Sequence, residues 1–230
     1  MALHELGTAQ KASRGVSLYS RYVNRPTGRV LAATAHGLGL TPNQVTLVSA
    51  VATVAGTAVL VSVPPTPLGS LLVWFLLALG FALDSADGQL ARLRGGGSVA
   101  GEWLDHVVDA GKMVAVHLGV LVMLYRFGPL RGPGLLVPLA FAVVSTLIFA
   151  GGTLALLVRR RAISVSPVRR PTSTITALGL LPADYGVLCL VFLLAWHRQA
   201  FFVTYSALLA VNVVLMCLLL GKWFRELSTS

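Results

Sequence analysis

Residues 84–109 read DSADGQLARLRGGGSVAGEWLDHVVD, and they hold most of the chemistry that the sequence displays. Five of the eight acidic residues of the chain lie in this stretch, although the flanking sequence is apolar enough to lie in a bilayer. Carboxylates at membrane depth are costly, so they are usually paired, bound to a metal or functional in another way. The five acidic residues are Asp84, Asp87, Glu102, Asp105 and Asp109.

The spacing of the four aspartates predicts that they gather at one place. Asp84 and Asp87 are three residues apart, and Asp105 and Asp109 are four apart, so each pair lies on one face of a helix. The link at 94–98 is short, which predicts that the two helices are antiparallel neighbours. Four converging carboxylates would repel one another unless a cation lay among them. Ligands that are all oxygen favour a hard ion, Mg²⁺ or Mn²⁺.

The composition of the whole chain is that of a membrane protein. Of its 230 residues, 56% are hydrophobic and 11% are charged, whereas a soluble domain carries roughly 25% charged residues. One domain suffices for this length. The net charge of +10 does not indicate nucleic acid, because the basic residues flank apolar segments and form no single soluble patch. Attraction to membrane lipids explains them better.

The hydropathy pattern predicts an all-α integral membrane protein in three parts. Residues 1–15 are polar and predicted to be flexible. Residues 16–37 mix basic and apolar side chains, as an amphipathic helix on the membrane surface does. Residues 38–225 form a membrane domain of six helices, the fifth being the weakest because Pro182 and Asp184 interrupt it. The six predicted spans, each near the ~20 residues that a transmembrane helix needs, cover 43–63, 68–93, 99–125, 135–158, 174–196 and 201–223.

The basic residues predict the orientation of these spans. Of the 18 lysines and arginines, only Arg126, Arg131 and Arg198 fall on one side of the predicted spans, and the others fall on the opposite side. The positive-inside rule makes the richer side cytoplasmic. We therefore expect both termini in the cytoplasm and the aspartates in the cytoplasmic half of the membrane.

The acidic stretch also has the form of a known signature. The pattern Asp84-x2-Asp87-Gly88-x2-Ala91-Arg92-x8-Gly101-x3-Asp105-x3-Asp109 resembles that of the CDP-alcohol phosphotransferases, integral membrane enzymes of phospholipid synthesis. All eight signature positions fit without a gap. The resemblance implies transfer of a substituted phosphate from a CDP-alcohol to a hydroxyl, with release of CMP. It also implies a homodimer in a prokaryotic cell membrane.

The resemblance implies roles for the residues of the signature. Asp84, Asp87 and Asp105 would hold the metal, and Asp109 would be the general base and also touch the metal. The residues implied at the nucleotide are Asn43, Asp84, Gly88, Ala91, Arg92 and Gly101. Small residues at 88 and 91 also suit tight packing between helices. Asn43 belongs to Pro42-Asn43-x2-Thr46, which resembles an element of the family's first span but also fits a plain helix start.

The acceptor site is less sharply defined by the sequence. Arginines near the cytoplasmic side could bind a phosphorylated acceptor such as inositol phosphate or glycerol phosphate. The candidates are Arg25, Arg159, Arg169 and Arg170. Attraction to anionic lipid explains Arg25 equally well, and positive-inside orientation explains the three arginines of the loop.

Three functions remain open at this point. The leading hypothesis is a phosphatidyltransferase, which moves the phosphatidyl group of CDP-diacylglycerol to a polar alcohol. The same chemistry with a soluble CDP-polyol or CDP-amino alcohol is an alternative, because the segment 20–25 resembles one found in inositol-phosphate transferases. A cation transporter is a remote alternative, because the polar residues concentrate at one end of two spans rather than along several.

Overall fold

The computed structural model describes residues 17–128, 132–162 and 174–228, and in these ranges it consists of helices and the turns between them. Within them, five helical segments are long and apolar enough to cross a membrane, one fewer than predicted. They are α3 (Pro42–Ser62), α4 (Pro67–Leu93), α5 (Val99–Phe127), the segment Gly132–Arg160 that includes most of α6 (Leu136–Ala162), and α9 (Arg198–Ser228). The all-α membrane class is therefore confirmed, whereas the count of six is not.

The fifth predicted span, residues 174–196, is divided into short pieces. They are α7 (Thr174–Gly179), the 3₁₀ turn η3 (Leu181–Ala183), α8 (Tyr185–Val191) and the 3₁₀ turn η4 (Phe192–Leu194). Pro182 has no backbone N–H to continue a helix. Asp184 starts the next one, because its carboxylate accepts a 2.8 Å hydrogen bond from the backbone N–H of Gly186. The apolar helix Tyr185–Leu194 is then about 15 Å long, half of the ~30 Å hydrocarbon core of a bilayer.

Polar caps set the starts of the first three spans. At α3, the Thr41 hydroxyl accepts a 3.3 Å hydrogen bond from the Gln44 backbone N–H, and the Gln44 side chain accepts a 2.8 Å bond from that of Thr41. This reciprocal pair satisfies two N–H groups that the helix itself leaves unpaired. Thr66 caps α4 and Ser98 caps α5 more simply, since each side chain accepts one hydrogen bond from a backbone N–H in the first turn of its helix.

The short link predicted between α4 and α5 is a glycine turn. Gly95 has a φ of +91° and Gly96 a φ of +126°, a region that residues with a side chain rarely adopt. The turn lets the chain reverse within a few residues.

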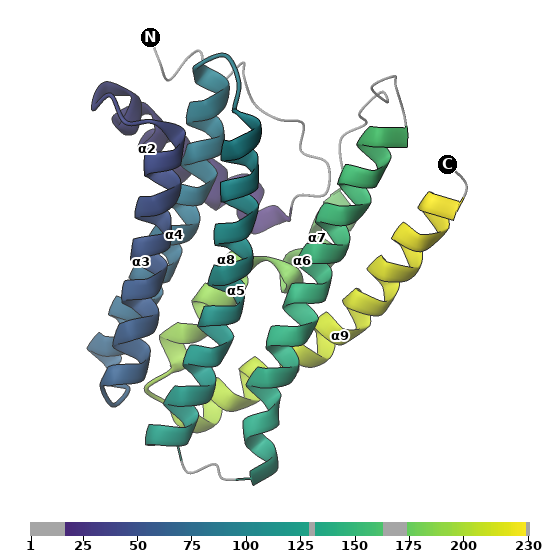
Figure 1. Cartoon of the computed structure of the whole chain (residues 1–230). Helices are drawn as coiled ribbons and strands as arrows, with labels where there is room; N and C mark the ends of the chain where they lie inside the picture. Colours follow the sequence, from purple (N-terminus) through teal and green to yellow (C-terminus); the bar gives the residue numbers. More distant parts are fainter. Residues whose placement is uncertain (1–16, 129–131, 163–173, 229–230) are drawn as a thin grey trace.

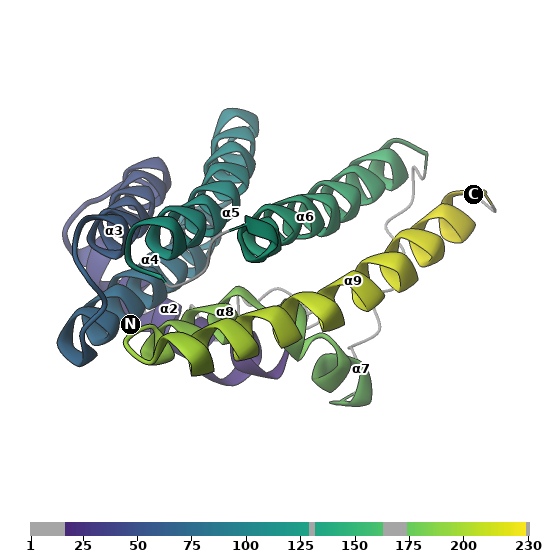
Figure 2. The same cartoon turned by 90° about the horizontal axis from the view of Figure 1, so that it is seen from below.

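Helix α3 packs closely along both α4 and α5 (Figures 1 and 2). The backbones of α4 and α5 make fewer close approaches to each other. Small residues make both contacts possible. The Ser49 hydroxyl of α3 donates a 2.7 Å hydrogen bond to the carbonyl of Gly80 on α4. On the α5 side, a Cβ at Gly119 would lie 2.7 Å from Thr57. The predicted pairing of α4 and α5 is found between their side chains, since the Lys112 ammonium of α5 lies 2.5 Å from the Asp84 carboxylate of α4.

A helix precedes the first span, where one was predicted. It begins with the π-helical turn η1 (Ser20–Asn24) and continues as α2 (Arg25–Gly37), which packs on α4. Ala32 and Ala35 are buried in one cluster with Ala86 and Leu90 of α4. This contact places α2 beside the part of α4 that carries Asp84 and Asp87. Its position on a membrane surface stays a prediction.

Helices α6 and α9 pack on each other, and α5 contacts α6 (Figure 2). A buried polar group joins the three helices. The ring of His117 on α5 shares hydrogen bonds of 2.6 Å with the Tyr205 hydroxyl of α9 and 2.9 Å with the Ser145 hydroxyl of α6. One ring nitrogen donates and the other accepts when the imidazole is neutral. These two hydrogen bonds give His117 a structural role, which is to join α5 to α6 and α9.

Candidate active site

Three of the four aspartates meet between α4 and α5. Asp84, Asp105 and Asp109 are half-buried and each offer a carboxylate oxygen, and these oxygens lie within 4.8 Å of one another. We call these three residues the aspartate triad. Because α4 and α5 are held apart by their packing on α3, the carboxylates can reach into the same place from two sides. The predicted convergence is thus found for three of the four residues.

The fourth aspartate, Asp87, faces α3. Its side chain is almost fully buried, and Oδ2 accepts a 2.5 Å hydrogen bond from the Thr46 hydroxyl. The backbone carbonyl of Pro42, one turn earlier in α3, lies 3.1 Å from the same hydroxyl and is the alternative acceptor for its single proton. Asp87 is therefore held beside the triad by a partner that the sequence did not assign to the site. The sequence did contain a signal for Thr46, because it is the last residue of the Pro42-Asn43-x2-Thr46 motif.

A lysine lies inside the triad. The Lys112 ammonium is 2.5 Å from Oδ1 of Asp84 on α4 and 3.0 Å from Oδ1 of Asp109 on its own helix. Its side chain is only 9% exposed. The sequence places Lys112 three residues after Asp109, which predicts the contact within α5 but not the one across to α4.

The donor set fits a divalent cation. Three carboxylates at this spacing supply only oxygen ligands, as Mg²⁺ and Mn²⁺ prefer. The ammonium of Lys112 already stands as a positive charge between two of them. Asp84, Asp105 and Asp109 are therefore the described residues best placed to hold a metal ion.

The residues predicted to bind the nucleotide surround the turn between α4 and α5. Asn43, in the first turn of α3, lies against Gly101 of α5, since a Cβ at Gly101 would be 2.9 Å from the Asn43 side-chain oxygen. The guanidinium of Arg92 folds back to within 3.5 Å of a Cβ built at Gly88. Ala91 lies beside the glycine turn. The structure therefore groups these residues at the aspartate end of the bundle.

The arginines predicted at the acceptor have different surroundings. The backbone carbonyl of Arg25 accepts a 3.1 Å hydrogen bond from the Gln89 side chain of α4. Burial lowers the pKa of the Arg25 guanidinium, and the nearby charges of Arg92 and Arg21 lower it further. Arg21, Arg25 and Arg92 together form a positive region next to the nucleotide residues.

The remaining acceptor candidates lie at the end of α6 or beyond it. Arg159 pairs with Glu226 of α9, and its neighbour Arg160 pairs with Glu102 of α5 over 2.6 Å. Arg169 and Arg170 lie outside the described residues. Among the acceptor candidates that the structure describes, Arg25 is the one whose charge senses a predicted nucleotide residue, Arg92.

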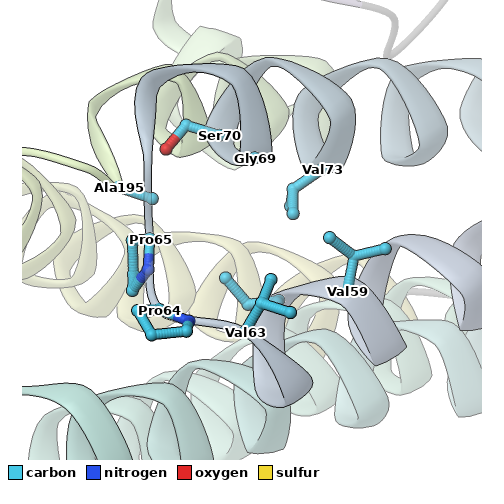
Figure 3. Close-up of a pocket in the computed structure, with 9 residues that line it drawn as sticks. Val59, Val63, Pro64, Pro65, Gly69, Ser70, Val73 and Ala195 are labelled. Atoms are coloured by element: carbon cyan, nitrogen blue, oxygen red, sulfur yellow. The ribbon is translucent and has the colours of Figure 1, made fainter.

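A small hollow at the other end of the bundle is not part of this site. Figure 3 shows that it lies where α3 ends and α4 begins, lined mainly by apolar residues. Its lining consists of Val59, Leu60, Val63, Pro64, Pro65, Gly69, Ser70, Val73 and Ala195. Gly69 precedes Asp84 by 15 residues of one helix, which is about 22 Å.

The profile of the CDP-alcohol phosphatidyltransferase family matches residues 39–223, which include every aspartate of the site. The chain belongs to the CDP-alcohol phosphatidyltransferase family. The resemblance of the signature is thus confirmed. With the five long apolar helices, membership also makes the chain an integral membrane protein.

The curated relatives of this family member include phosphatidylinositol phosphate synthases and a cholinephosphotransferase. Phosphatidylinositol phosphate synthase of Mycobacterium marinum is 39% identical over 84 residues, which cover 36% of this chain and 34% of that protein. Cholinephosphotransferase 1 of Xenopus laevis is 36% identical over 101 residues, covering 41% of this chain and 25% of that protein. The matched stretches span well under two thirds of these relatives.

Solved structures confirm the fold. Mycobacterium tuberculosis phosphatidylinositol phosphate synthase with CDP-DAG bound has a TM-score of 0.57 and 22% identity, covering 88% of this chain and 94% of that one. The same synthase in complex with manganese and citrate has a TM-score of 0.59 and covers 85% of this chain. The chain therefore shares the arrangement of helices of a family member over most of its length.

Proposed function

We propose that this protein transfers the phosphatidyl group of CDP-diacylglycerol to the hydroxyl of a polar alcohol and releases CMP. The observation that carries the proposal is the aspartate triad, in which Asp84, Asp105 and Asp109 meet from two helices. The family and the CDP-DAG bound to a solved relative support the donor.

The metal ligands in this proposal are the triad and Asp87, and the ion is Mg²⁺, with Mn²⁺ as a substitute. A divalent ion held by these carboxylates would supply positive charge to polarise the pyrophosphate of the donor and to neutralise the departing CMP. Manganese in the crystal of the related synthase supports a divalent ion. Thr46 keeps Asp87 oriented through its 2.5 Å hydrogen bond.

Asp109 acts as the general base in this proposal. The acceptor hydroxyl oxygen bonds to the phosphorus that carries the diacylglycerol, and its proton passes to the Asp109 carboxylate. The bond from that phosphorus to the bridging oxygen breaks, and CMP leaves with the electron pair. The Lys112 ammonium holds Oδ1 of Asp109 at 3.0 Å and so fixes the orientation of this carboxylate.

The nucleotide lies at the turn between α4 and α5, against Asn43, Gly88, Ala91, Arg92 and Gly101. Glycine at 88 and 101 lets the nucleotide approach the helix backbone, and Arg92 pairs with a phosphate. The acceptor binds beside it at Arg25, and Arg159, Arg169 and Arg170 are further candidate contacts for its phosphate. A phosphorylated acceptor suits this positive region, and inositol phosphate is the first candidate because of the names of the mycobacterial relatives.

We further propose six membrane crossings, with both termini in the cytoplasm and a homodimer as the assembly. The segment 185–195 serves as the missing crossing. The ring of Tyr185 packs at a tilt against that of Phe81, one turn before Asp84, and Ala195 lines the hollow at the opposite end of the bundle. The short helix thus runs through half of the membrane. The helix before α3 lies on the membrane surface.

The test is CMP release by the purified full chain in lipid nanodiscs. CDP-diacylglycerol is supplied with Mg²⁺ and, in turn, with inositol phosphate, glycerol phosphate, inositol or serine. We expect CMP with one acceptor, its loss on adding EDTA and its return with Mg²⁺ or Mn²⁺. A parallel reaction with a soluble CDP-alcohol tests the alternative donor. CMP from the soluble donor alone would overturn the phosphatidyl assignment.

A further inference from the structure

Lys112 takes no part in bond making in the proposed chemistry, where it only orients the Asp109 carboxylate. It lies three residues after Asp109 on α5, and its ammonium reaches across to Asp84 on α4. Because the backbones of these two helices make fewer close approaches to each other than to α3, Lys112 makes one of the side-chain links that join them at this level. Its side chain is only 9% exposed, so little water screens its charge.

The ammonium and a divalent ion compete for the same carboxylates. Lys112 uses Oδ1 of Asp84 and Oδ1 of Asp109, two members of the aspartate triad that the proposed function assigns to the metal. If the ammonium stays in place, it repels the ion. If it swings away, two buried ion pairs are lost. In either case metal binding is weaker than the three carboxylates alone would allow.

We propose that Lys112 is a built-in counter-cation that lowers the affinity of the aspartate triad for its divalent ion. This inference rests on the metal assignment of the proposed function. Lys112 keeps Asp84 and Asp109 together and charge-balanced when the ion is away, and it makes the ion easier to release. It is a positioning residue and takes no part in bond making.

The size of the effect follows from Coulomb's law. A divalent ion and an ammonium about 5 Å apart repel by an amount equal to about tenfold in a binding constant, even with the dielectric constant of water. A half-buried site strengthens the repulsion. Removing the charge of Lys112 is therefore expected to tighten metal binding by about tenfold or more.

The experiment measures Mn²⁺ binding by the purified full chain in nanodiscs, from the loss of the electron paramagnetic resonance signal of free Mn²⁺. Lys112→Gln and Lys112→Met remove the charge, and Lys112→Arg keeps it. Lys222→Gln is the matched control, because Lys222 is exposed near the end of α9. We expect both neutral variants to bind Mn²⁺ about tenfold or more tightly than wild type. Lys112→Arg and Lys222→Gln should stay within about twofold, because the local charge is unchanged.

A second measurement distinguishes this role from a purely structural one. The melting temperature of each variant is taken in EDTA and in Mn²⁺. We expect Lys112→Gln to melt below wild type in EDTA and to gain more from Mn²⁺ than wild type does. A variant too unstable without metal is prepared in Mn²⁺, and its affinity is read by competition with a chelator.

The outcomes separate this inference from the proposed function. Equal or weaker Mn²⁺ binding by the neutral variants overturns the role of Lys112 and leaves the metal site intact. Absence of Mn²⁺ binding by wild type and by Lys222→Gln overturns the metal assignment itself, whatever CMP release shows.

Discussion

The Thr46 hydroxyl of α3 donates a 2.5 Å hydrogen bond to the buried carboxylate of Asp87 on α4. This bond crosses the most extensive helix contact in the described part of the chain, that of α3 with α4, and holds the one signature aspartate that lies outside the triad. The pairing matters because a buried carboxylate without a donor is costly.

Replacing Thr46 by Val tests this pairing. Valine keeps the shape of threonine but leaves Asp87 without the donor, so we expect a loss of about 1–3 kcal/mol of stability. Thr46→Ser keeps a hydroxyl and should remain close to wild type. Melting curves in detergent give the comparison, and equal melting of the two variants would show that the bond does not matter.

Asp109→Asn tests the general base. Loss of a general base lowers rates by about 10²–10⁴, and we expect CMP release to fall by that factor. Glu102→Gln is the control on the same helix, because Glu102 pairs with Arg160 at a partly exposed position. That pair contributes at most about 1 kcal/mol. CMP release at the wild-type rate by Asp109→Asn would contradict the assignment.

Gly101→Ala tests the contact with Asn43. The added methyl would lie 2.9 Å from the Asn43 oxygen, so this flexible side chain must turn away. We expect a rise of about fivefold in the KM for the CDP donor, the equivalent of about one hydrogen bond. The matched control is Gly111→Ala on the same helix, where a Cβ meets no atom within 4 Å. If both variants raise KM alike, Asn43 is not at the nucleotide.

Asp184→Ala tests whether Asp184 holds the segment that begins at Ser17 in place. Ser17 and Ser20 both donate to the Asp184 carboxylate, which also caps α8. Loss of the cap alone costs about 0.5–2 kcal/mol. We expect faster hydrogen exchange at residues 17–24 and at the start of α8. Asp184→Asn keeps an acceptor oxygen and should exchange more slowly than the alanine variant, and unchanged exchange in the alanine variant would exclude an anchoring role.

Local patterns in the sequence predicted much of this structure. Thr41 and Pro42 mark the start of α3, and the glycines at 95 and 96 mark the turn after α4. These signals act over three or four residues, so they can be read directly from the chain. The triad was predictable for the same reason, since helical spacing places Asp105 and Asp109 on one face.

Features that depend on contacts between distant segments were not predictable. Nothing in the acidic stretch shows that α3 packs along both α4 and α5, and so the separate environment of Asp87 was missed. The reach of Lys112 to Asp84 was missed for the same reason. The break before Tyr185 was foreseen as a weak point, but its length depends on the cap that Asp184 forms.

The hydrogen bonds from Ser17 and Ser20 to Asp184 have a consequence for biosynthesis. Ser17 and Asp184 are 167 positions apart in the chain. At a synthesis rate of about 5–20 residues per second, the ribosome needs about 10–30 s to make the intervening segment. Ser17 and Ser20 therefore wait for their acceptor until residue 184 has been made. Closure of this end of the bundle is a late step in the maturation of the nascent chain.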